Sequence, residues 1–430
     1  MLKNLFTSWA LFCGLFLIMV GNGLLGVIIG LRANNAEFGT ISIGLLMGGY
    51  FLGLFLGALF VPKIVSNVGH IRTFGALSAI ASSAALLHII NQDPIFWTLI
   101  RILTGFTYSG IYIVVESWLN EKSNNKNRGQ ILSFYMIISM GGFGIGQILG
   151  GFENETDNFL FILVSILVSI AVVPMLITAS KAPDFSAPES LTFKRLYHIS
   201  PLGLIGMLFN GLTISMTNGM GIIYAINIGM SPLQSSIFLA SLNIGNLILQ
   251  YPIGKLSDIL DRRVVILIVS FMAFLITGIA FFYSSNFLVL FFLMGLYGGF
   301  SHTIYSLCIA HTNDYLPPKQ MVGASSTLIT INGIGAILGS PIIALFMSYF
   351  GNLSFFFIIS LTFLTFTIFI IIRIFIRKSI PNEAQGNFVA VPESSTAIAT
   401  PLNPETEWDK REKNANEDEY LENPYYLKKD

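Results

Sequence analysis

Two charged residues and one histidine stand alone in long apolar stretches of the sequence, at Arg101, Glu116 and His302. Burying a guanidinium in hydrocarbon costs about 3 kcal/mol on insertion scales. Arg101 therefore indicates either a water-filled cavity or a side chain that snorkels to the membrane surface. An Arg can hold an anionic group through two parallel hydrogen bonds. A histidine ordinarily titrates near neutral pH, which suits His302 to proton transfer.

Helical geometry places further residues near Arg101 and Glu116. At about 100° per residue, Tyr108 and Tyr112 share the face of Arg101, and Glu116 lies about 60° around the helix and about 22 Å along it. Both tyrosines could equally be packing residues. Four amides in apolar stretches are further candidates for solute binding, although amides in hydrocarbon more often bond neighbouring helices. They are Asn22, Asn210, Asn243 and Gln250.

The whole chain has the composition of an integral membrane protein. Its 430 residues are 53% hydrophobic and 11% charged, with a mean hydropathy of +0.72, whereas soluble domains carry about 25% charged residues. Zero net charge argues against nucleic acid as a partner. Cys13 and Cys308 lie far apart in apolar stretches and predict neither a disulfide nor a metal site. We also expect no cofactor.

Charge-free intervals predict twelve transmembrane helices, because a span needs about 20 apolar residues. Six intervals precede a polar linker, and three double-length intervals follow it, with turns expected at 229–232, 283–286 and 349–354. The predicted parts are an N-terminal six-helix bundle, the cytoplasmic linker, a C-terminal six-helix bundle and a disordered cytoplasmic tail rich in Pro, Glu and Asn. Their ranges are 1–179, 180–200, 201–379 and 380–430.

The basic residues predict the orientation. With both termini in the cytoplasm, 21 of the 23 Lys and Arg residues lie on the cytoplasmic side, Arg32 lies outside and Arg101 lies within the membrane. This bias follows the positive-inside rule and predicts a multi-pass protein of the cell inner membrane.

Segments of the first half recur in the second half. PKIVSNVGHIR (62–72) matches GKLSDILDRRV (254–264), and GFGIGQILGG (142–151) matches GAILGSPIIA (335–344). GKLSDILDRR resembles the Gly-x-x-x-Asp-x-x-x-Arg-Arg signature of the major facilitator superfamily, and RILTG resembles its fourth-helix signature. IVVESWLNEKSNNKNRGQILSFYM and IAHTNDYLPPKQMVGAS resemble the YcaD-like branch. The resemblance implies two pseudo-symmetric bundles with a solute site between them near the midplane.

The same resemblance suggests residues that gate the cytoplasmic side. It implies that the loop with Asp258 lies across the helix that starts near Gly129, where a carboxylate is favoured, and that Glu116 pairs with Arg262. The alternative is a structural loop that carries only positive-inside charges. Glycines four apart let helices slide closely. The predicted gating residues are Glu116, Arg128, Asp258, Arg262, Arg263, Gly142 and Gly146.

Three departures limit the resemblance. Ser66 replaces the usual Asp of the first-half loop, Gln147 replaces the Pro of the fifth-helix antiporter signature, and the first span has no acid. The last departure weighs against a cationic-drug exporter, and the second weighs against antiport.

The predicted function is secondary active transport of a small organic solute, with an anion as the candidate class, by a monomer coupled to protons or a counter-solute. Multidrug or metabolite efflux is one alternative, and a transporter-derived sensor or scaffold that acts through its tail is another. No Gly-x-x-x-x-Gly-Lys-Ser/Thr motif occurs, so ATP is not the direct energy source. An enzyme is not expected, because the intramembrane residues supply no nucleophile with a base and an orienting group.

Overall fold

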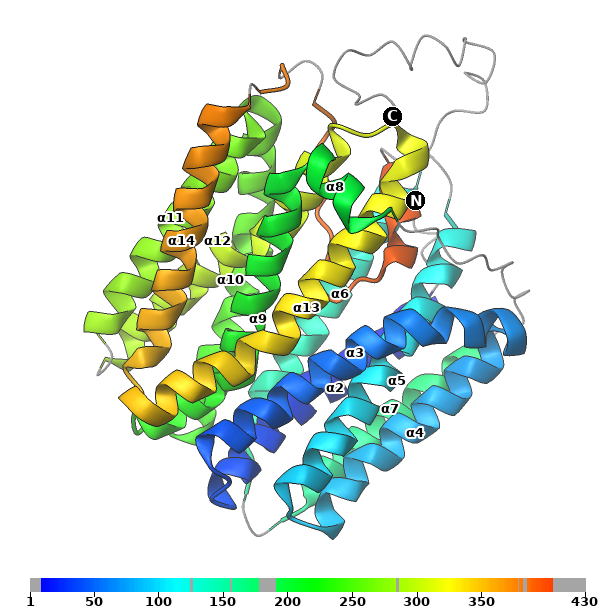
Figure 1. Cartoon of the computed structure of the whole chain (residues 1–430). Coiled ribbons are helices and arrows are strands. Elements are labelled where there is room, and N and C mark those ends of the chain that lie inside the picture. The colour runs from blue at the N-terminus through cyan, green and yellow to red at the C-terminus, as the bar shows by residue number, and fades with distance from the viewer. Residues whose placement is uncertain are drawn as a thin grey trace.

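The computed structural model describes residues 9–123, 127–154, 157–177, 191–283, 286–377, 379–381 and 385–404. Within these residues, six long helices precede the linker and six follow it (Figure 1). The first six are α2 (Trp9–Asn35), α3 (Thr40–Val68), α4 (His70–Ile90), α5 (Pro94–Glu121), α6 (Arg128–Gly150) and α7 (Phe159–Ile177). The second six are α9 (Pro201–Asn227), α10 (Pro232–Ile259), α11 (Arg262–Phe282), α12 (Phe287–Asn313), α13 (Pro318–Phe350) and α14 (Ser354–Ile376).

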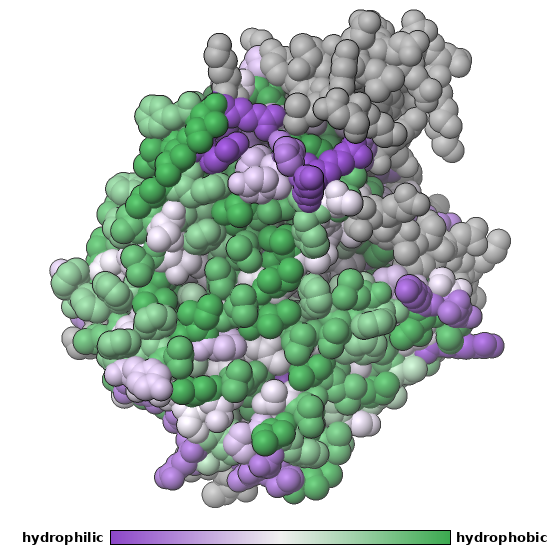
Figure 2. All heavy atoms as spheres, in the orientation of Figure 1, coloured by the Kyte–Doolittle hydropathy of each residue, from purple (hydrophilic) through white to green (hydrophobic). Residues whose placement is uncertain are grey.

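Most of these helices are suited to a membrane. Ten are individually long and apolar enough to cross one, and α9 meets the same criterion together with the short α8 (Phe193–Ile199), to which it is bent by 114°. In α7 the apolar part is shorter, Phe159–Pro174. Hydrophobic side chains cover the middle of the surface, and hydrophilic ones gather towards its two ends (Figure 2). The protein is therefore an all-α membrane protein, as predicted.

Helix starts follow local sequence signals. Asp93 caps α5 by accepting a hydrogen bond from the Phe96 amide at 2.8 Å, and Pro94 occupies the first turn. Ser231 and Gln234 form a capping box at α10. The three turns predicted in the second half are confirmed, since helices end at Asn227, Phe282 and Phe350.

Helix packing repeats between the halves. In the first half α2 packs on α6 and α7, α3 packs on α5, and α4 packs on α5 and α7. The corresponding contacts of the second half are α9 with α13 and α14, α10 with α12, and α11 with α12 and α14. This correspondence gives the two pseudo-symmetric six-helix bundles that the sequence repeat predicts.

The two ends of the molecule differ. We call the end where α2 begins and α5 ends the basic end, because the predicted cytoplasmic Lys and Arg residues lie there, and the other end the far end. At the far end the bundles are in direct contact: a Cβ on Gly44 of α3 would lie 2.3 Å from the Ala344 Cβ of α13. Likewise, a Cβ on Gly151, just after α6, would lie 2.8 Å from the Leu233 Cα of α10.

At the basic end a chain segment lies between the bundles. Residues 385–404, which we call the plug segment, enter this space and end in the 3-10 helix η2 (Ala397–Leu402) (Figure 1). This differs from the predicted disordered tail. The composition of 380–430 as a whole hides two short apolar runs, FVAVP (388–392) and AIA (397–399), and several of their side chains contact the core. The remainder, 405–430, lies outside the described residues.

The motif around Asp258 is also more helical than predicted. α10 continues to Ile259 and α11 begins at Arg262, so Asp258 lies in the last turn of one helix and Arg262 in the first turn of the next. Asp261 caps α11 by accepting from the Arg263 amide at 3.0 Å. Helices thus extend beyond the apolar intervals, because a cap satisfies the exposed amides as well as a loop would.

Candidate solute site between the bundles

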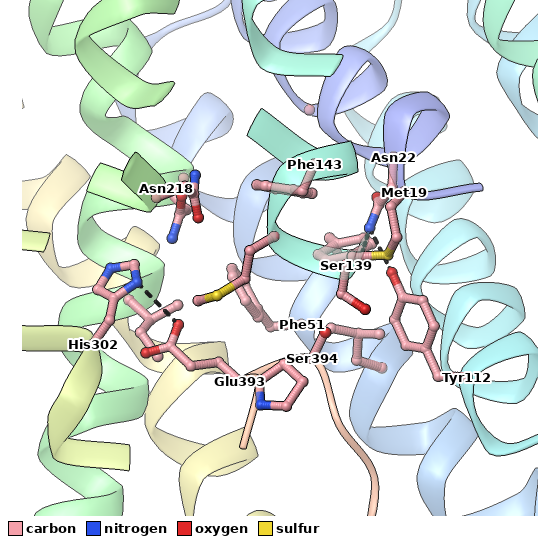
Figure 3. Close-up of a pocket in the computed structure, with 18 of the residues that line it drawn as sticks. Met19, Asn22, Phe51, Tyr112, Ser139, Phe143, Asn218, His302, Glu393 and Ser394 are labelled. Atoms are coloured by element: carbon pink, nitrogen blue, oxygen red, sulfur yellow. Dashed lines mark hydrogen bonds and ion pairs between the residues drawn. The ribbon is translucent and has the colours of Figure 1, made fainter. Parts of the chain in front are cut away.

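A central cavity of about 160 Å³ lies between the two bundles. Both bundles and the plug segment contribute to its wall, and Figure 3 shows His302 with Glu393 on one side and Asn22 with Tyr112 on the other. Among its lining residues are Met19, Asn22, Tyr50, Phe51, Arg101, Tyr112, Ser139, Asn218, Asn243, His302, Pro392, Glu393 and Ser394. The cavity therefore brings together five of the eight residues that we predicted to bind solute.

Arg101 lines this cavity and is 4% exposed. Its Nε and Nη1 atoms are buried and have no hydrogen-bond partner among the described residues. The guanidinium carbon lies 4.5 Å from the centre of the Tyr50 ring, which gives a cation–π contact but no counter-charge. A buried charge without a partner is costly, and no acidic side chain of the described residues pairs with this one.

An amide and two tyrosines form a network in the first bundle. The Asn22 side-chain nitrogen donates to the hydroxyls of Tyr50 and Tyr112, both at 2.8 Å. Tyr50 was not among the predicted residues, since an aromatic in an apolar span has no local signal of function. The network fixes the ring of Tyr50, over which the Arg101 guanidinium lies.

His302 occupies the opposite wall, on α12. Its Nδ1 lies 3.3 Å from the Glu393 Oε2 of the plug segment, and both residues line the cavity (Figure 3). A carboxylate thus already lies in the cavity that holds Arg101. It comes from a segment for which sequence analysis predicted no position.

Three predicted solute residues lie away from the cavity. The buried Tyr108 ring packs 6.2 Å from the Tyr112 ring, centre to centre. Gln250 donates to the Ser306 hydroxyl at 3.0 Å within the second bundle. Asn210 is 2% exposed, and its amide atoms have no partner among the described residues. By contrast, Asn243 lines the cavity and donates to Gln147 of the other bundle at 2.8 Å.

The predicted gating residues of the second bundle form a polar cluster at the basic end. Arg262 pairs with Asp314 at 2.6 Å and lies 3.5 Å from Asp258. Arg263 pairs with Asp261 at 2.7 Å. None of these contacts joins the first bundle directly.

The predicted gating residues of the first bundle have other partners. Glu116 is fully buried and accepts from the Tyr135 hydroxyl at 2.6 Å. Arg128 donates to the Pro401 carbonyl at 2.7 Å. The pairing of Glu116 with Arg262 was predicted for a closed basic end, and in this conformation the bundles are separated there, so it stays a prediction.

Gly142 and Gly146 pack α6 onto α2 within the first bundle. A Cβ on Gly146 would lie 2.1 Å from the Val20 carbonyl oxygen, and one on Gly142 would lie 3.0 Å from the Met19 Cβ. Only glycine permits this approach, and whether these helices slide on each other is a prediction.

A metal centre has no support in the described residues, which contain no group of three His, Cys, Asp or Glu side chains placed to hold an ion. Cys13 and Cys308 are both free thiols.

Comparisons with known proteins agree with this architecture. The sequence matches the Major Facilitator Superfamily over residues 11–197 and 203–408. An uncharacterized MFS-type transporter YcaD of Salmonella typhimurium is 25% identical over 359 residues, which cover 82% of this chain and 92% of that protein.

Solved structures show the same fold. The nucleoside transporter NupG has a TM-score of 0.70 at 15% identity, with 86% of this chain and 100% of that chain covered. A bacterial homolog of the human lysosomal transporter Spinster, solved in an inward-facing and unoccupied conformation, has a TM-score of 0.69 at 14% identity, with 95% of this chain and 99% of that chain covered. By the extent of the family match, the chain belongs to the major facilitator superfamily.

Proposed function

We propose that this protein is a secondary active transporter of a small organic anion, in which the central cavity binds a carboxylate or a similar group. Family membership supports transport rather than enzymatic chemistry. The protein works as a monomer in the cell inner membrane with its basic end in the cytoplasm, in keeping with the distribution of Lys and Arg.

The unpartnered guanidinium of Arg101 carries the proposal of an anion. Snorkelling to the surface is disfavoured, since Arg101 is buried and lines the cavity. The Tyr50 ring attracts the cation but does not neutralise it. A solute carboxylate would supply the missing charge and accept hydrogen bonds from both free nitrogens.

Alternating access is supported by the difference between the two ends. Direct contacts close the far end, as at Gly44 and Ala344, whereas the bundles are separate at the basic end. This corresponds to an inward-facing state. The transport cycle would pass to a state in which the basic end closes and the far end opens, as in rocking of two parallel repeats around a central site.

Proton coupling would use His302. It faces the same cavity as Arg101 and already contacts one carboxylate, that of Glu393. A proton on the imidazole would favour an anion in the cavity, so that the solute and the proton bind together.

Thermal-shift measurements with paired ligands test the anionic substrate. The purified protein is screened against small carboxylates and, for each, its neutral amide. A carboxylate that binds the cavity raises the melting temperature by mass action, and its amide does not. We expect Arg101→Gln to weaken carboxylate binding about 10- to 100-fold, because a hydrogen bond to a charged group contributes about 1.5–3 kcal/mol.

The controls separate the charge from its geometry. Arg101→Lys keeps the charge but loses the planar fork, so it should bind weakly. Arg72→Gln changes an exposed basic residue outside the cavity and should leave binding unchanged. Equal stabilisation by amides and carboxylates, or unchanged binding in Arg101→Gln, would show that the solute is not an anion held by Arg101.

A sensor that acts through its tail is the second candidate, because the plug segment reaches the solute cavity. Efflux of varied drugs is less well supported, since the cavity presents a cation rather than an acid of the helices. Exchange of the stabilising carboxylate in proteoliposomes separates these functions: a transporter moves it across the membrane, whereas a sensor binds it without transport.

A further inference from the structure

The plug segment forms a hairpin-like loop between the two bundles. A turn closes its tip, where the Ser395 amide donates to the Pro392 carbonyl at 2.9 Å. The tip residues Glu393 and Ser394 lie in the central cavity (Figure 3). The legs of the loop run from this tip towards the basic end.

The first leg, residues 385–391, binds the second bundle through its main chain. The Phe388 amide donates to Asp258 at 2.6 Å, and the Val391 amide donates to the Ser306 hydroxyl at 3.0 Å. At Gly386, the carbonyl accepts from Arg262 at 2.7 Å and the amide donates to Asp314 at 3.0 Å. The basic-end cluster therefore recognises peptide groups.

Shape adds to these hydrogen bonds. A Cβ on Gly254 would lie 2.2 Å from the Phe388 ring, so the ring lies directly on the helix backbone of α10. Phe388 and Val391 also pack on the apolar core. A larger residue in place of Gly254 would block this contact with the Phe388 ring.

The second leg, residues 396–404, binds the first bundle. The Thr396 amide donates to Glu116 at 3.0 Å, and the Thr396 hydroxyl donates to the same carboxylate. Asn120 donates to the Ile398 carbonyl, and Arg128 donates to the Pro401 carbonyl. The hydrogen bonds of this leg thus go to the first bundle, while η2 also packs on α13 of the second bundle.

The tip divides the space between the bundles. A second cavity of about 320 Å³ lies beside it on the basic-end side, lined by Lys63, Ser326 and Thr330 among others. Glu393 and Ser394 line both this cavity and the central one. Without them the two volumes would form one continuous vestibule from Arg101 towards the basic end.

We propose that residues 385–404 are a tethered plug that binds both bundles at the basic end, fills the route to the central cavity and keeps the bundles apart there. The side chain of Glu393 lines the same cavity as Arg101 and so occupies space that a solute anion would need. That last point rests on the proposed function, whereas the binding of the plug itself does not.

Two physical consequences follow. A plug tethered by a short linker after α14 acts at an effective concentration in the millimolar range, so a solute must compete with it. Closure of the basic end also requires the Asp258 cluster to approach α5 and α6, and the two legs occupy that space. With the plug bound, the protein is held in one conformation.

Cysteine accessibility tests the plug without a known solute. In a protein with Cys13 and Cys308 replaced by alanine, Ser139→Cys places one thiol in the central cavity, where Ser139 is 1% exposed. Deletion of 385–430 should raise the rate of maleimide labelling about tenfold or more, because reaction no longer waits for local opening. Deletion of 405–430, which keeps the plug, should leave the rate unchanged, and so should Asn91→Cys at the far end in all three proteins.

A matched pair of full-length variants covers the case in which the truncated protein does not fold. Thr396→Pro removes both the amide and the hydroxyl that donate to Glu116, and should speed labelling of Ser139→Cys. Thr396→Ser keeps both and should not. A synthetic peptide of residues 385–404, added to the protein without 385–430, should slow labelling again, and a scrambled peptide should not.

The outcomes separate this proposal from the transport proposal. Equal, slow labelling with and without 385–404, or no effect of Thr396→Pro, would overturn the plug. Failure of every carboxylate to bind would overturn the anionic substrate and leave the labelling difference intact.

Discussion

The far end and the basic end join the same two bundles by different means. At the far end, helix meets helix through glycines, as where Gly44 faces Ala344. At the basic end, polar and charged side chains from both bundles bind a peptide that lies between them. The same helix pairs pack in both halves, so the two ends differ in what lies between the bundles and not in how each bundle is built.

The difference indicates which contacts change when the conformation changes. Close helix packing excludes water along the whole contact. A peptide held by separate hydrogen bonds can leave, because water replaces each of them, and each contributes only about 1.5–3 kcal/mol even when one partner is charged. We infer that the far end must open by rigid movement of the bundles and that the basic end must first release its plug.

The largest effect is expected from a side chain that breaks the far-end contact. Gly44→Leu would place its Cβ 2.3 Å from the Ala344 Cβ and 2.9 Å from the Ser340 carbonyl oxygen. Overpacking of this kind costs about 1–3 kcal/mol, which shifts a two-state population up to about 100-fold. Spin labels at Asn91 and Tyr283, one on each bundle at the far end, should move apart.

Gly75→Leu provides the matched control, because a Cβ there meets nothing within 4 Å. It should leave the spin-label distance unchanged. An unchanged distance in a folded Gly44→Leu protein would show that the far end is not held by this contact.

The sequence predicted the centre of the molecule better than its basic end. Arg101 and His302 were identifiable as candidates, because an ionisable side chain within an apolar stretch is costly to bury and is therefore uncommon without a function. Tyr50 was missed, since its role depends on Asn22, 28 positions away. Helical angles placed Tyr108 on the face of Arg101, but they do not say which neighbour covers each part of that face.

The plug was missed for a different reason. Composition averages over a segment, and the tail as a whole has few apolar residues. Its anchors, such as Thr396 on Glu116, join positions 280 residues apart, and no local pattern encodes such a contact. Short peptides of this kind order only where a preformed surface offsets their conformational entropy.

The next effect is a pH dependence of the basic end. Burial raises the pKa of the Glu393 carboxyl well above its usual range. His302 contacts this carboxyl, the Tyr297 and Tyr305 phenols interact with it, and Arg101 lines the same cavity. A bound plug therefore takes up a proton, either on the carboxyl or shared with His302, whereas a free carboxylate with a pKa of about 4.3 is ionised at neutral pH.

Because binding takes up a proton, plug binding through Glu393 weakens as the pH rises. The contribution of Glu393 to plug binding is fully present below about pH 4.3 and is lost as the pH rises towards its raised pKa, by up to about tenfold per pH unit. Labelling of Ser139→Cys, normalised to the exposed Asn91→Cys, should be slower at acid pH. Glu393→Gln should abolish this dependence, and its persistence would assign the proton to another group, such as Glu116.

The smallest effect is expected at Asp258, which serves the basic end in two ways. With the plug bound it accepts from the Phe388 amide at 2.6 Å, and sequence analysis predicts that it also holds the closed basic end by engaging α6. Asp258→Asn keeps an acceptor but loses the charge, which about halves the strength of such a bond, and the side chain is 32% exposed. In the full chain we expect labelling of Ser139→Cys to rise only about threefold, which corresponds to well under 1 kcal/mol.

In the protein without 385–430, the same change should lengthen spin-label distances between the basic ends of the two bundles, because the carboxylate then has only its closing role. Asp261→Asn, at a carboxylate that pairs with Arg263, is the control for both measurements. Faster labelling without any change of distance would assign Asp258 to the plug alone, and a change of distance without faster labelling would assign it to closure alone.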